Sequence, residues 1–220
     1  NAEKEKSNLS EIDGINQKVE VLRDKYGINH IYANNQNDLF FMQGYLAARD
    51  RLFQFEMWRR QATGTVSEIF GKKELERDIG TRLFKFRGNI KDELNYYHED
   101  GYEIISSFVS GINRYITEIN NDPDNLPIEF KVLGIVPKEW TNEDVISRHQ
   151  GLLGNIEEEL NIGRAVSLIG EKRVKEILWF HPKEPSLKLP ENISYDDLKQ
   201  DILRLYNACL LYTSDAADEE

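Results

Sequence analysis

The most regular apolar pattern of the chain lies in its first third. Apolar residues recur there at three- and four-residue steps and form one face of a helix: Phe41, Tyr45, Ala48, Leu52 and Phe55. Six further apolar residues cover much of the remaining circumference: Phe40, Met42, Leu46, Phe53, Met57 and Trp58. A helix that is apolar nearly all round is a buried one. The pattern therefore predicts a central helix that is the most buried element of the fold.

Charged residues interrupt this apolar surface at positions that the helix would bury. Burial of an unpaired charge costs roughly several kcal/mol. Glu56 and Arg60 stand four residues apart and can pair within the helix. Asp50 lies between two arginines, and we expect it to pair with an arginine inside the folded body. The residues alone thus predict a scaffold helix with an ion-pair network.

Capping residues mark the limits of this helix and of the next one. Asn37 is the expected N-cap and Gly64 the expected end. Thr65 and Glu68 have the three-residue spacing of a capping box and predict a second, short helix that ends at Gly71.

Alternating residues before the central helix predict two strands, Val19–Arg23 and Ile28–Ala33. Gly27 lies in the turn between them and is free to adopt a positive φ. We expect the strands to pair as a hairpin that lies against the helical body. The expected architecture is therefore α+β and mostly helical, with an N-terminal β-hairpin.

Helical spacing continues in the second half of the chain. A regular apolar stripe from Ile104 to Ile119 predicts a second strong helix. Residues 126–140 contain two prolines and are too irregular for a helix. Thr141 and Asp144 are expected to cap the helix that follows, and helical spacing returns over residues 157–170.

The chain is expected to consist of a flexible polar lead, residues 1–16, one folded region, residues 17–208, and a tail, residues 209–220. Ser194 is expected to cap a last helix that reaches Tyr206. The tail, which begins CLLYTSDAADE, has no helical period and resembles the translation of a sequencing adapter found in metagenomic reads. Under this interpretation the natural sequence stops near residue 208, and an ordinary ragged C-terminus is the alternative.

Composition narrows the class of protein. Apolar and charged fractions of 40% and 30% are those of a folded globular chain. The net charge of -11 argues against a nucleic-acid-binding protein, because no basic patch is visible. No apolar run approaches the roughly 18 residues of a membrane span. The chain begins at Asn1 rather than at methionine, which leaves room for a signal peptide upstream.

Candidate catalytic groups are sparse. The four histidines have no metal-ligand spacing, and the sequence lacks a Gly-rich phosphate loop, a GxSxG elbow and an HExxH motif. Glu157, Glu158 and Glu159 could supply a ligand for a hard cation, or they could form a solvated helix face. The residues alone therefore predict a mostly helical body without an assigned function.

A series of motifs in the first third changes this interpretation. In order they are VLRD, YGINHIYA, DLFFMQGY, ARDRLFQFE, a pair of arginines and GTVSEIFG, within residues 21–71. Together they resemble the opening of the penicillin acylase family, the heterodimeric N-terminal nucleophile amidohydrolases, and weaker agreement continues to Gly170. Asn29 departs from the family pattern, which has proline there, and is expected to loosen a turn.

The resemblance implies a secreted or periplasmic precursor with an αββα fold that cuts itself into a helix-rich α chain and a longer β chain. The first residue of the β chain, normally serine, is the nucleophile, its own α-amino group is the base, and an oxyanion hole holds the tetrahedral intermediate. All of these groups belong to the β chain. We therefore expect this chain to be the α chain, to pair with a β chain and to be inactive alone.

The resemblance also implies two sites on this chain. Four residues after the Lys138–Trp140 segment are expected to line the acyl side of the substrate pocket, with core packing as the alternative: Leu152, Leu153, Asn155 and Ile156. Glu159, or else Glu158, is expected to join β-chain aspartates around a calcium ion.

Three functions remain open at this point. The first is hydrolysis of a linear N-acyl amide such as a β-lactam side chain. The second is the same chemistry on acyl-homoserine lactones or lipopeptides, because the depth of the pocket sets the acyl group. The third is a binding or structural homologue that kept the scaffold without a nucleophile.

Overall fold

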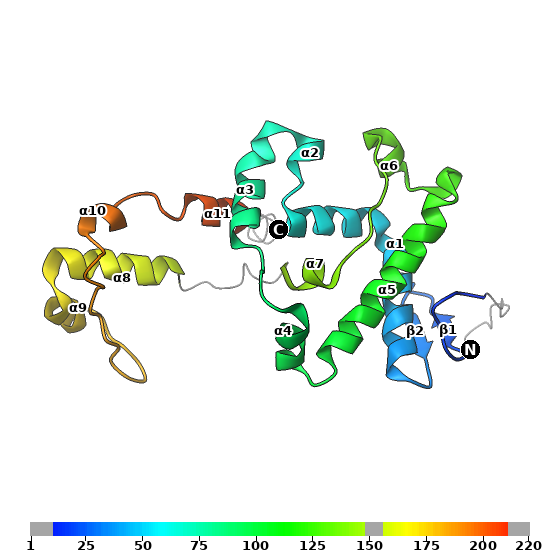
Figure 1. Cartoon of the computed structure of the whole chain (residues 1–220), viewed down its shortest axis with the longest axis horizontal. Coiled ribbons are helices and arrows are strands. Elements are labelled where there is room, and N and C mark those ends of the chain that lie inside the picture. The colour runs from blue at the N-terminus through cyan, green and yellow to red at the C-terminus, as the bar shows by residue number, and fades with distance from the viewer. Residues whose placement is uncertain (1–10, 148–155, 211–220) are drawn as a thin grey trace.

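The computed structural model describes residues 11–147 and 156–210, which are mostly helical with a two-stranded sheet near the N-terminal end (Figure 1). This confirms the predicted α+β class. In chain order the helices are α1 (Gln36–Thr63), α2 (Ser67–Phe70), η1 (Lys72–Glu74), α3 (Leu75–Phe84), α4 (Ile90–Tyr97), α5 (Gly101–Asn120), η2 (Pro123–Asn125), α6 (Ile128–Leu133), α7 (Asn142–Ser147), α8 (Ile156–Ile169), α9 (Glu171–Ile177), α10 (Tyr195–Leu198) and α11 (Arg204–Leu210).

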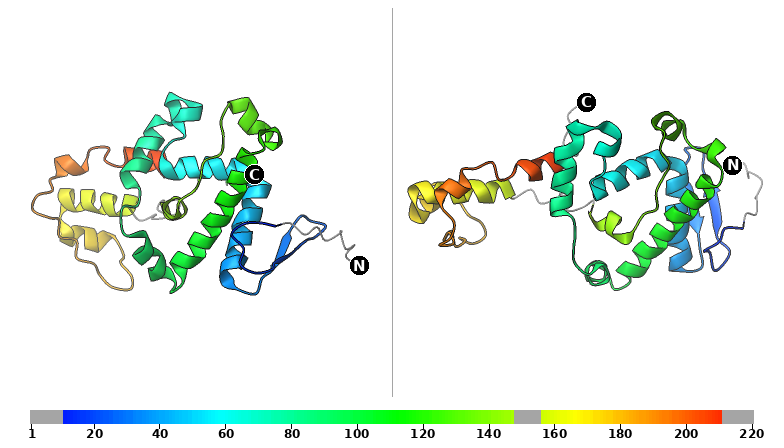
Figure 2. Two further views of the ribbon diagram at one scale, coloured as in Figure 1. Left: turned by 45° about the vertical axis from the view of Figure 1, so that its right-hand side comes forward. Right: turned by 45° about the horizontal axis from the view of Figure 1, so that its top comes forward.

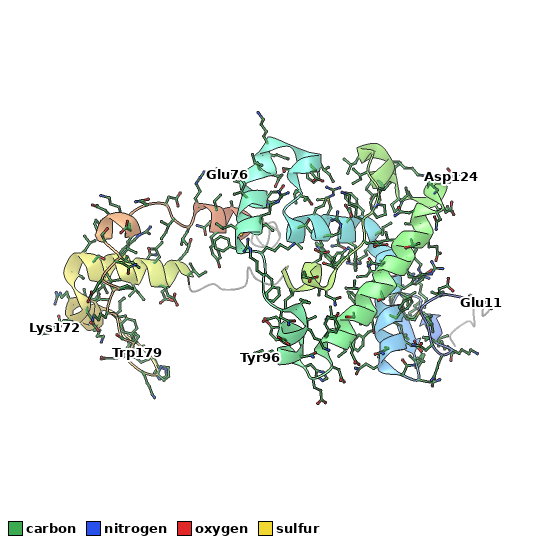
Figure 3. All side chains as sticks on the ribbon, in the orientation of Figure 1. Glu11, Glu76, Tyr96, Asp124, Lys172 and Trp179 are labelled. Atoms are coloured by element: carbon green, nitrogen blue, oxygen red, sulfur yellow. The ribbon has the colours of Figure 1, made fainter. Side chains whose placement is uncertain are left out.

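Helices α1 and α5 cross at the centre of the main body, and the other elements surround this crossing. Figure 2 shows in both views that α8, α9 and α10 project from this body, whereas α11 returns to lie beside α3. Trp179, just after α9, is 86% exposed at the end of this projection (Figure 3).

The predicted hairpin is confirmed. β1 (Glu20–Arg23) and β2 (Asn29–Tyr32) pair antiparallel, with Val21 opposite Ile31. Gly27 has a φ of 82°, which the turn requires and which glycine adopts without steric cost. Val21 and Ile31 point to the same face of the sheet and pack against the apolar start of α1.

The first turn of α1 is capped by Asn35 rather than by the predicted Asn37. The Asn35 side chain accepts a hydrogen bond from the backbone N–H of Asp38 at 2.8 Å. The Asp38 carboxylate in turn accepts the backbone N–H groups of Asn16 and Gln17, each at 2.9 Å. Burial raises the pKa of Asp38, but these hydrogen bonds outweigh burial and hold the pKa below its usual value. They tie the segment before the hairpin to the start of α1.

Two glycines allow α1 and α5 to cross with their backbones in contact. A Cβ added to Gly44 would overlap the carbonyl oxygen of Phe108, and one added to Gly111 would overlap that of Phe41. Apolar side chains from both helices and from residues 126–140 pack beside this crossing as the main core: Ala48, Leu52, Phe55, Ile112, Ile116, Phe130 and Trp140. The predicted central helix and second strong helix are therefore the two halves of one core.

Besides Asp38 near its start, α1 buries a second carboxylate at Glu56, which is 1% exposed. Arg59 donates two hydrogen bonds to its carboxylate, at 2.7 and 3.1 Å, and Arg60 donates one at 2.8 Å. The backbone N–H of Lys138 donates a fourth at 3.1 Å. The predicted pair of Glu56 and Arg60 is confirmed, and it belongs to a network that joins α1 to the segment before α7.

Asp50 pairs with an arginine, but the prediction that this pair lies inside the body is wrong. Its carboxylate accepts hydrogen bonds from Arg23 at 2.9 Å and from Asn29 at 3.0 Å, and the side chain keeps 24% of its exposure. At the next residue, Arg51, α1 leaves helical geometry with φ of -142° and ψ of 39°. Asn29 thus ties β2 to α1 at this bend, which differs from the expected loosening of the turn.

The predicted capping box of Thr65 and Glu68 does not form. Helix α2 begins at Ser67, and no side chain caps it locally. Instead the Asp78 carboxylate of α3 accepts the backbone N–H groups of Val66 at 3.0 Å and Ser67 at 2.7 Å. Glu68 forms an ion pair with the arginine network of α1. The predicted helix ends are correct: α1 ends at Gly64 and α2 at Gly71.

The later elements agree in part with expectation. The prediction that residues 126–140 are too irregular for a helix is wrong, because they include the short helix α6 after Pro127. The backbone N–H of Thr141 donates to the Asp144 carboxylate at 2.8 Å, which is one of the two hydrogen bonds of the predicted cap of α7. Ser194 forms the predicted cap, but its helix ends at Leu198 and α11 is a separate element.

Candidate functional site

The residues expected to line the acyl pocket follow α7. Leu152, Leu153 and Asn155 lie in the segment 148–155, outside the described residues. Ile156 is the first residue of α8 and is half-buried. The structure therefore places one of the four predicted pocket residues and leaves the prediction for the other three as it stands.

The elements on the N-terminal side of that segment are held rigidly. Asn113 of α5 accepts the backbone N–H of Trp140 and donates its amide to the Trp140 carbonyl, both at 2.8 Å. The indole ring packs on Phe55, with ring centroids 5.3 Å apart. Asn142 donates to the Ser106 hydroxyl of α5 at 2.8 Å. These contacts hold the start of α7 against α5.

Sequence analysis did not identify Asn113 as an anchor of this segment. One signal was available, because this polar residue lies between the apolar positions Ile112 and Ile116 of the α5 stripe. An amide near a helix stripe can pair with both backbone groups of an approaching strand-like segment, since it carries a donor and an acceptor. No sequence pattern indicated which segment that would be.

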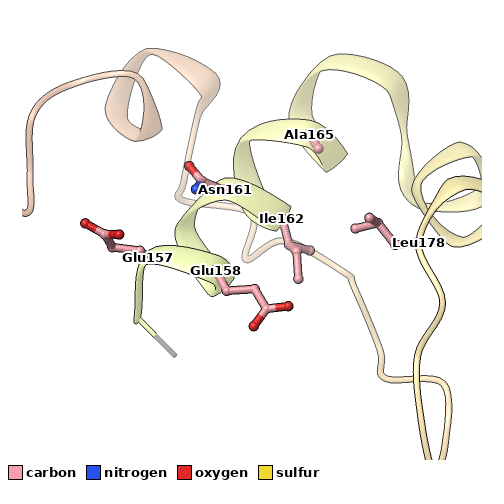
Figure 4. A pocket seen from close by; sticks show the side chains of 6 residues that line it. All are labelled: Glu157, Glu158, Asn161, Ile162, Ala165 and Leu178. Carbon is pink, nitrogen blue, oxygen red and sulfur yellow. The ribbon is translucent and has the colours of Figure 1, made fainter. Parts of the chain in front are cut away.

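An open groove of about 560 Å³ runs along α8, the helix that follows this segment in sequence. Its apolar wall is formed by Ile162 and Ala165 of α8 and by Leu178 after α9 (Figure 4). Glu157 and Glu158 lie at its end and point to opposite sides of the helix. In sequence, its first lining residue, Glu157, directly follows Ile156.

Glu158 and Glu159 offer the carboxylate oxygens that calcium prefers, but they are too few for a site. Both are exposed, and consecutive helical residues diverge by about 100°, so the two cannot easily bind one ion together. Calcium takes about six to eight oxygen ligands. Within residues 11–147 and 156–210, no group of three acidic, histidine or cysteine side chains could hold a metal ion. A calcium site at Glu158 or Glu159 would therefore need further ligands besides those of the described residues.

Titratable groups in the described part of the chain are engaged in local structure. His30 lies 3.3 Å from the Asp24 carboxylate, and Nδ1 of His98 accepts the backbone N–H of Asp100 at 3.1 Å. Burial raises the pKa of the Cys209 thiol, which disfavours the nucleophilic thiolate. These groups stabilise turns and helix ends rather than orient a nucleophile. None of the described helices has the length and apolar character needed to cross a membrane.

Comparison with known proteins gives one consistent family. The sequence model described as Penicillin amidase matches residues 18–193. Penicillin G acylase of Escherichia coli is 36% identical over 138 residues, which are 62% of this chain and 16% of that protein. Penicillin acylase 2 proenzyme of Pseudomonas sp. strain SE83 is 28% identical over 197 residues, or 88% of this chain and 25% of that protein. Acyl-homoserine lactone acylase QuiP of Pseudomonas syringae pv. tomato is 28% identical over 183 residues, or 81% and 22%.

A solved structure of a thermostable penicillin G acylase from Alcaligenes faecalis has the same fold, with a TM-score of 0.60 and 27% identity. The match covers 80% of this chain and 99% of the solved polypeptide chain. By contrast, the chain spans only 16% to 25% of the length of the curated relatives named above. The family match, the relatives and the fold agree: this chain belongs to the penicillin amidase family.

Proposed function

We propose that this chain is the α-chain region of a self-processing hydrolase that cleaves linear N-acyl amides, in the manner of a penicillin acylase. The observation that carries the proposal is the contrast in coverage. The chain matches 99% of one polypeptide in a penicillin G acylase structure, yet it spans a quarter or less of the full relatives. Because the matched solved polypeptide is itself nearly fully covered, the contrast supports a protein made of more than one chain, and one relative is named a proenzyme.

In this proposal the reacting groups belong to a β chain derived from the same precursor. Its N-terminal residue attacks the amide carbonyl, its α-amino group takes the proton through a water molecule, and backbone donors stabilise the oxyanion. After the amine leaves, water hydrolyses the acyl-enzyme. This chain supplies no reacting group: the core of α1 and α5 holds the Trp140 segment, which precedes the proposed pocket residues in sequence.

The acyl side of the pocket is proposed to include Leu152, Leu153, Asn155 and Ile156. Three of these are apolar or branched, which suits an aryl or alkyl acyl group better than a charged one. A second candidate substrate class is the acyl-homoserine lactones or lipopeptides. The similarity to acyl-homoserine lactone acylase QuiP favours this alternative, because that relative is matched over 81% of the chain. A non-catalytic scaffold or binding homologue is the remaining possibility.

Two further features are proposed on the basis of the family resemblance. Glu159, or else Glu158, would supply one carboxylate to a calcium ion whose other ligands belong to the β chain. The ion would stabilise the assembled chains and would not enter the reaction. The mature protein is proposed to be periplasmic or secreted.

The proposal is tested by expressing the chain together with the continuation of its gene. Purified protein is assayed with a chromogenic phenylacetyl amide, a long-chain acyl amide and an acyl-homoserine lactone. We expect amide hydrolysis by the assembled protein and none by the 220-residue chain alone. A Cys209→Ser chain serves as a control for thiol chemistry. If the assembled protein hydrolyses none of the three, the result contradicts the proposal and favours the scaffold alternative.

A further inference from the structure

The segment between α6 and α7, residues 135–141, has neither helical nor strand structure. Backbone N–H and C=O groups without partners in a helix or sheet need other partners where they are buried. Here, polar side chains of the two crossing helices supply them. Asn120 of α5 donates to the carbonyl of Pro137 at 3.2 Å. Glu56 of α1 accepts the backbone N–H of Lys138 at 3.1 Å, so the core holds successive residues of the segment.

Asn113 of α5 makes the contact of this kind that lies nearest to α7. Its amide oxygen accepts the backbone N–H of Trp140 and its amide nitrogen donates to the Trp140 carbonyl, both at 2.8 Å. The Trp140 ring packs on Phe55, and its buried indole N–H has no hydrogen-bond partner in the described part of the chain. The hydrogen bonds that place Trp140 are therefore those of its backbone to Asn113.

The chain itself connects this contact to the proposed pocket. Helix α7 begins two residues after Trp140 and ends at Ser147, and Leu152, the first proposed pocket residue, follows five positions later. Five residues span at most about 18 Å, so the position of α7 restricts the position of Leu152. Asn142, the first residue of α7, also donates to Ser106 of α5 at 2.8 Å. A shift at Trp140 would therefore displace the start of the helix that leads to the proposed pocket.

We propose that Asn113 is a positioning residue for the acyl side of the substrate pocket and that it acts through Trp140 and α7. This inference rests on the proposed function. An amide suits the role because it supplies one donor and one acceptor to the same backbone residue, whereas a carboxylate supplies acceptors alone. Because Asn113 contributes no reacting group, its loss changes how well the acyl group fits rather than how fast the amide bond is cleaved.

The test substitutes Asn113→Asp in protein made from the chain and the continuation of its gene. The variant keeps the size of the side chain and the acceptor for the Trp140 N–H, but it places a carboxylate oxygen against the Trp140 carbonyl. Kinetics are measured with a chromogenic phenylacetyl amide, a long-chain acyl amide and an acyl-homoserine lactone. We expect KM for the best of the three to rise about tenfold or more, the effect of a misfit of one methylene group, while kcat changes less than about threefold.

The matched control is Asn120→Asp, which makes the same exchange on the same helix and breaks the bond to Pro137. Glu56 holds Lys138 between that bond and α7, so KM should stay within about twofold of wild type. A merely structural role of Asn113 gives a different pattern. Less folded protein lowers the apparent kcat for every substrate and leaves KM unchanged. Thermal melts of the variants report the folded fraction independently.

Unchanged KM with Asn113→Asp in folded, active protein would overturn the inference, and so would an equal rise in KM with Asn120→Asp. If Asn113→Asp does not fold, Ser106→Ala is read in its place by the same criteria, because it removes the hydroxyl that binds Asn142. A folded wild-type assembly that hydrolyses none of the three substrates contradicts the proposed function and this inference with it. An active wild type with the same KM as Asn113→Asp contradicts this inference alone.

Discussion

Glu56 provides the sharpest test of what holds the central helix in place. The substitution Glu56→Gln keeps the size of the side chain and removes its charge. In the wild type this carboxylate accepts three hydrogen bonds from Arg59 and Arg60 and one from the backbone of Lys138. Both arginine side chains are nearly as buried as the carboxylate, with 9% and 4% exposure. The substitution therefore leaves positive charge in the core without its compensating partner.

The magnitude follows from what each arginine retains. Removal of one member of a buried pair typically costs about 3–5 kcal/mol, because the remaining charge is uncompensated. Arg60 keeps a second carboxylate, Glu68, at 2.8 Å, and Arg59 does not share that contact. We therefore expect the free energy of unfolding to fall by an amount near the lower limit, about 3 kcal/mol. For a chain of this size that corresponds to a fall in melting temperature of roughly 6–12 °C.

The assay is urea unfolding of the purified chain followed by circular dichroism, together with a thermal melt. The matched control is Glu176→Gln, because Arg173 and Glu176 have the same three-residue spacing and the same 2.7 Å distance as Arg59 and Glu56. That control pair is exposed, so its loss should cost less than about 1 kcal/mol. If Glu56→Gln is destabilised no more than Glu176→Gln, the buried network does not stabilise the fold as described here.

Three further substitutions test other contacts. Gly111→Ala would force a methyl group against the Phe41 carbonyl, and overpacking of this kind should cost about 1–3 kcal/mol in urea unfolding; an unchanged midpoint would mean that the helices do not touch there. Asp50→Ala breaks a partly exposed pair and should lower the free energy of unfolding by no more than about 1 kcal/mol. A decrease as large as that for a core substitution would contradict the surface position of Asp50. Burial, and then the hydrogen bond to Glu118, raise the pKa of Tyr45 to about 12. Its stabilising contribution is complete below pH 10 and is lost as pH rises toward 12, so wild type should lose more stability over that range than Tyr45→Phe, and parallel losses would refute this.

Periodicity predicted the hairpin, α1 and α5 correctly, because each buries a continuous face and burial repeats with the geometry of the element. It failed where partners come from distant sequence. Glu56 and Asp50 were both expected to be buried and paired, but α1 bends at Arg51, and of the two only Glu56 is buried. Helical spacing assumes a straight axis and cannot reveal such a bend. The cap of α2 likewise comes from Asp78 of the next helix rather than from the local Thr65.

The candidate site was less accessible to sequence reasoning. The family resemblance supplied its residues, since no catalytic motif marks them, and three of the four pocket positions lie outside the described residues. The structure adds the contacts that hold residues 138–140, which precede these positions in sequence. Asn113 and Glu56 each bind backbone groups of residues 138–140. No sequence pattern marks a contact between a polar side chain and a distant backbone segment, so only the fold reveals these contacts.

The central claim is that this chain is one subunit of an acylase whose reaction centre lies on another polypeptide. The most direct test is intact-mass spectrometry of the active fractions purified after expression of the chain with the continuation of its gene. The account predicts that amide hydrolysis elutes with two polypeptides, one of which contains Gly111 and the α1–α5 core, and that neither is active when separated. Amide hydrolysis by an uncut single polypeptide, or by the 220-residue chain alone, would contradict it.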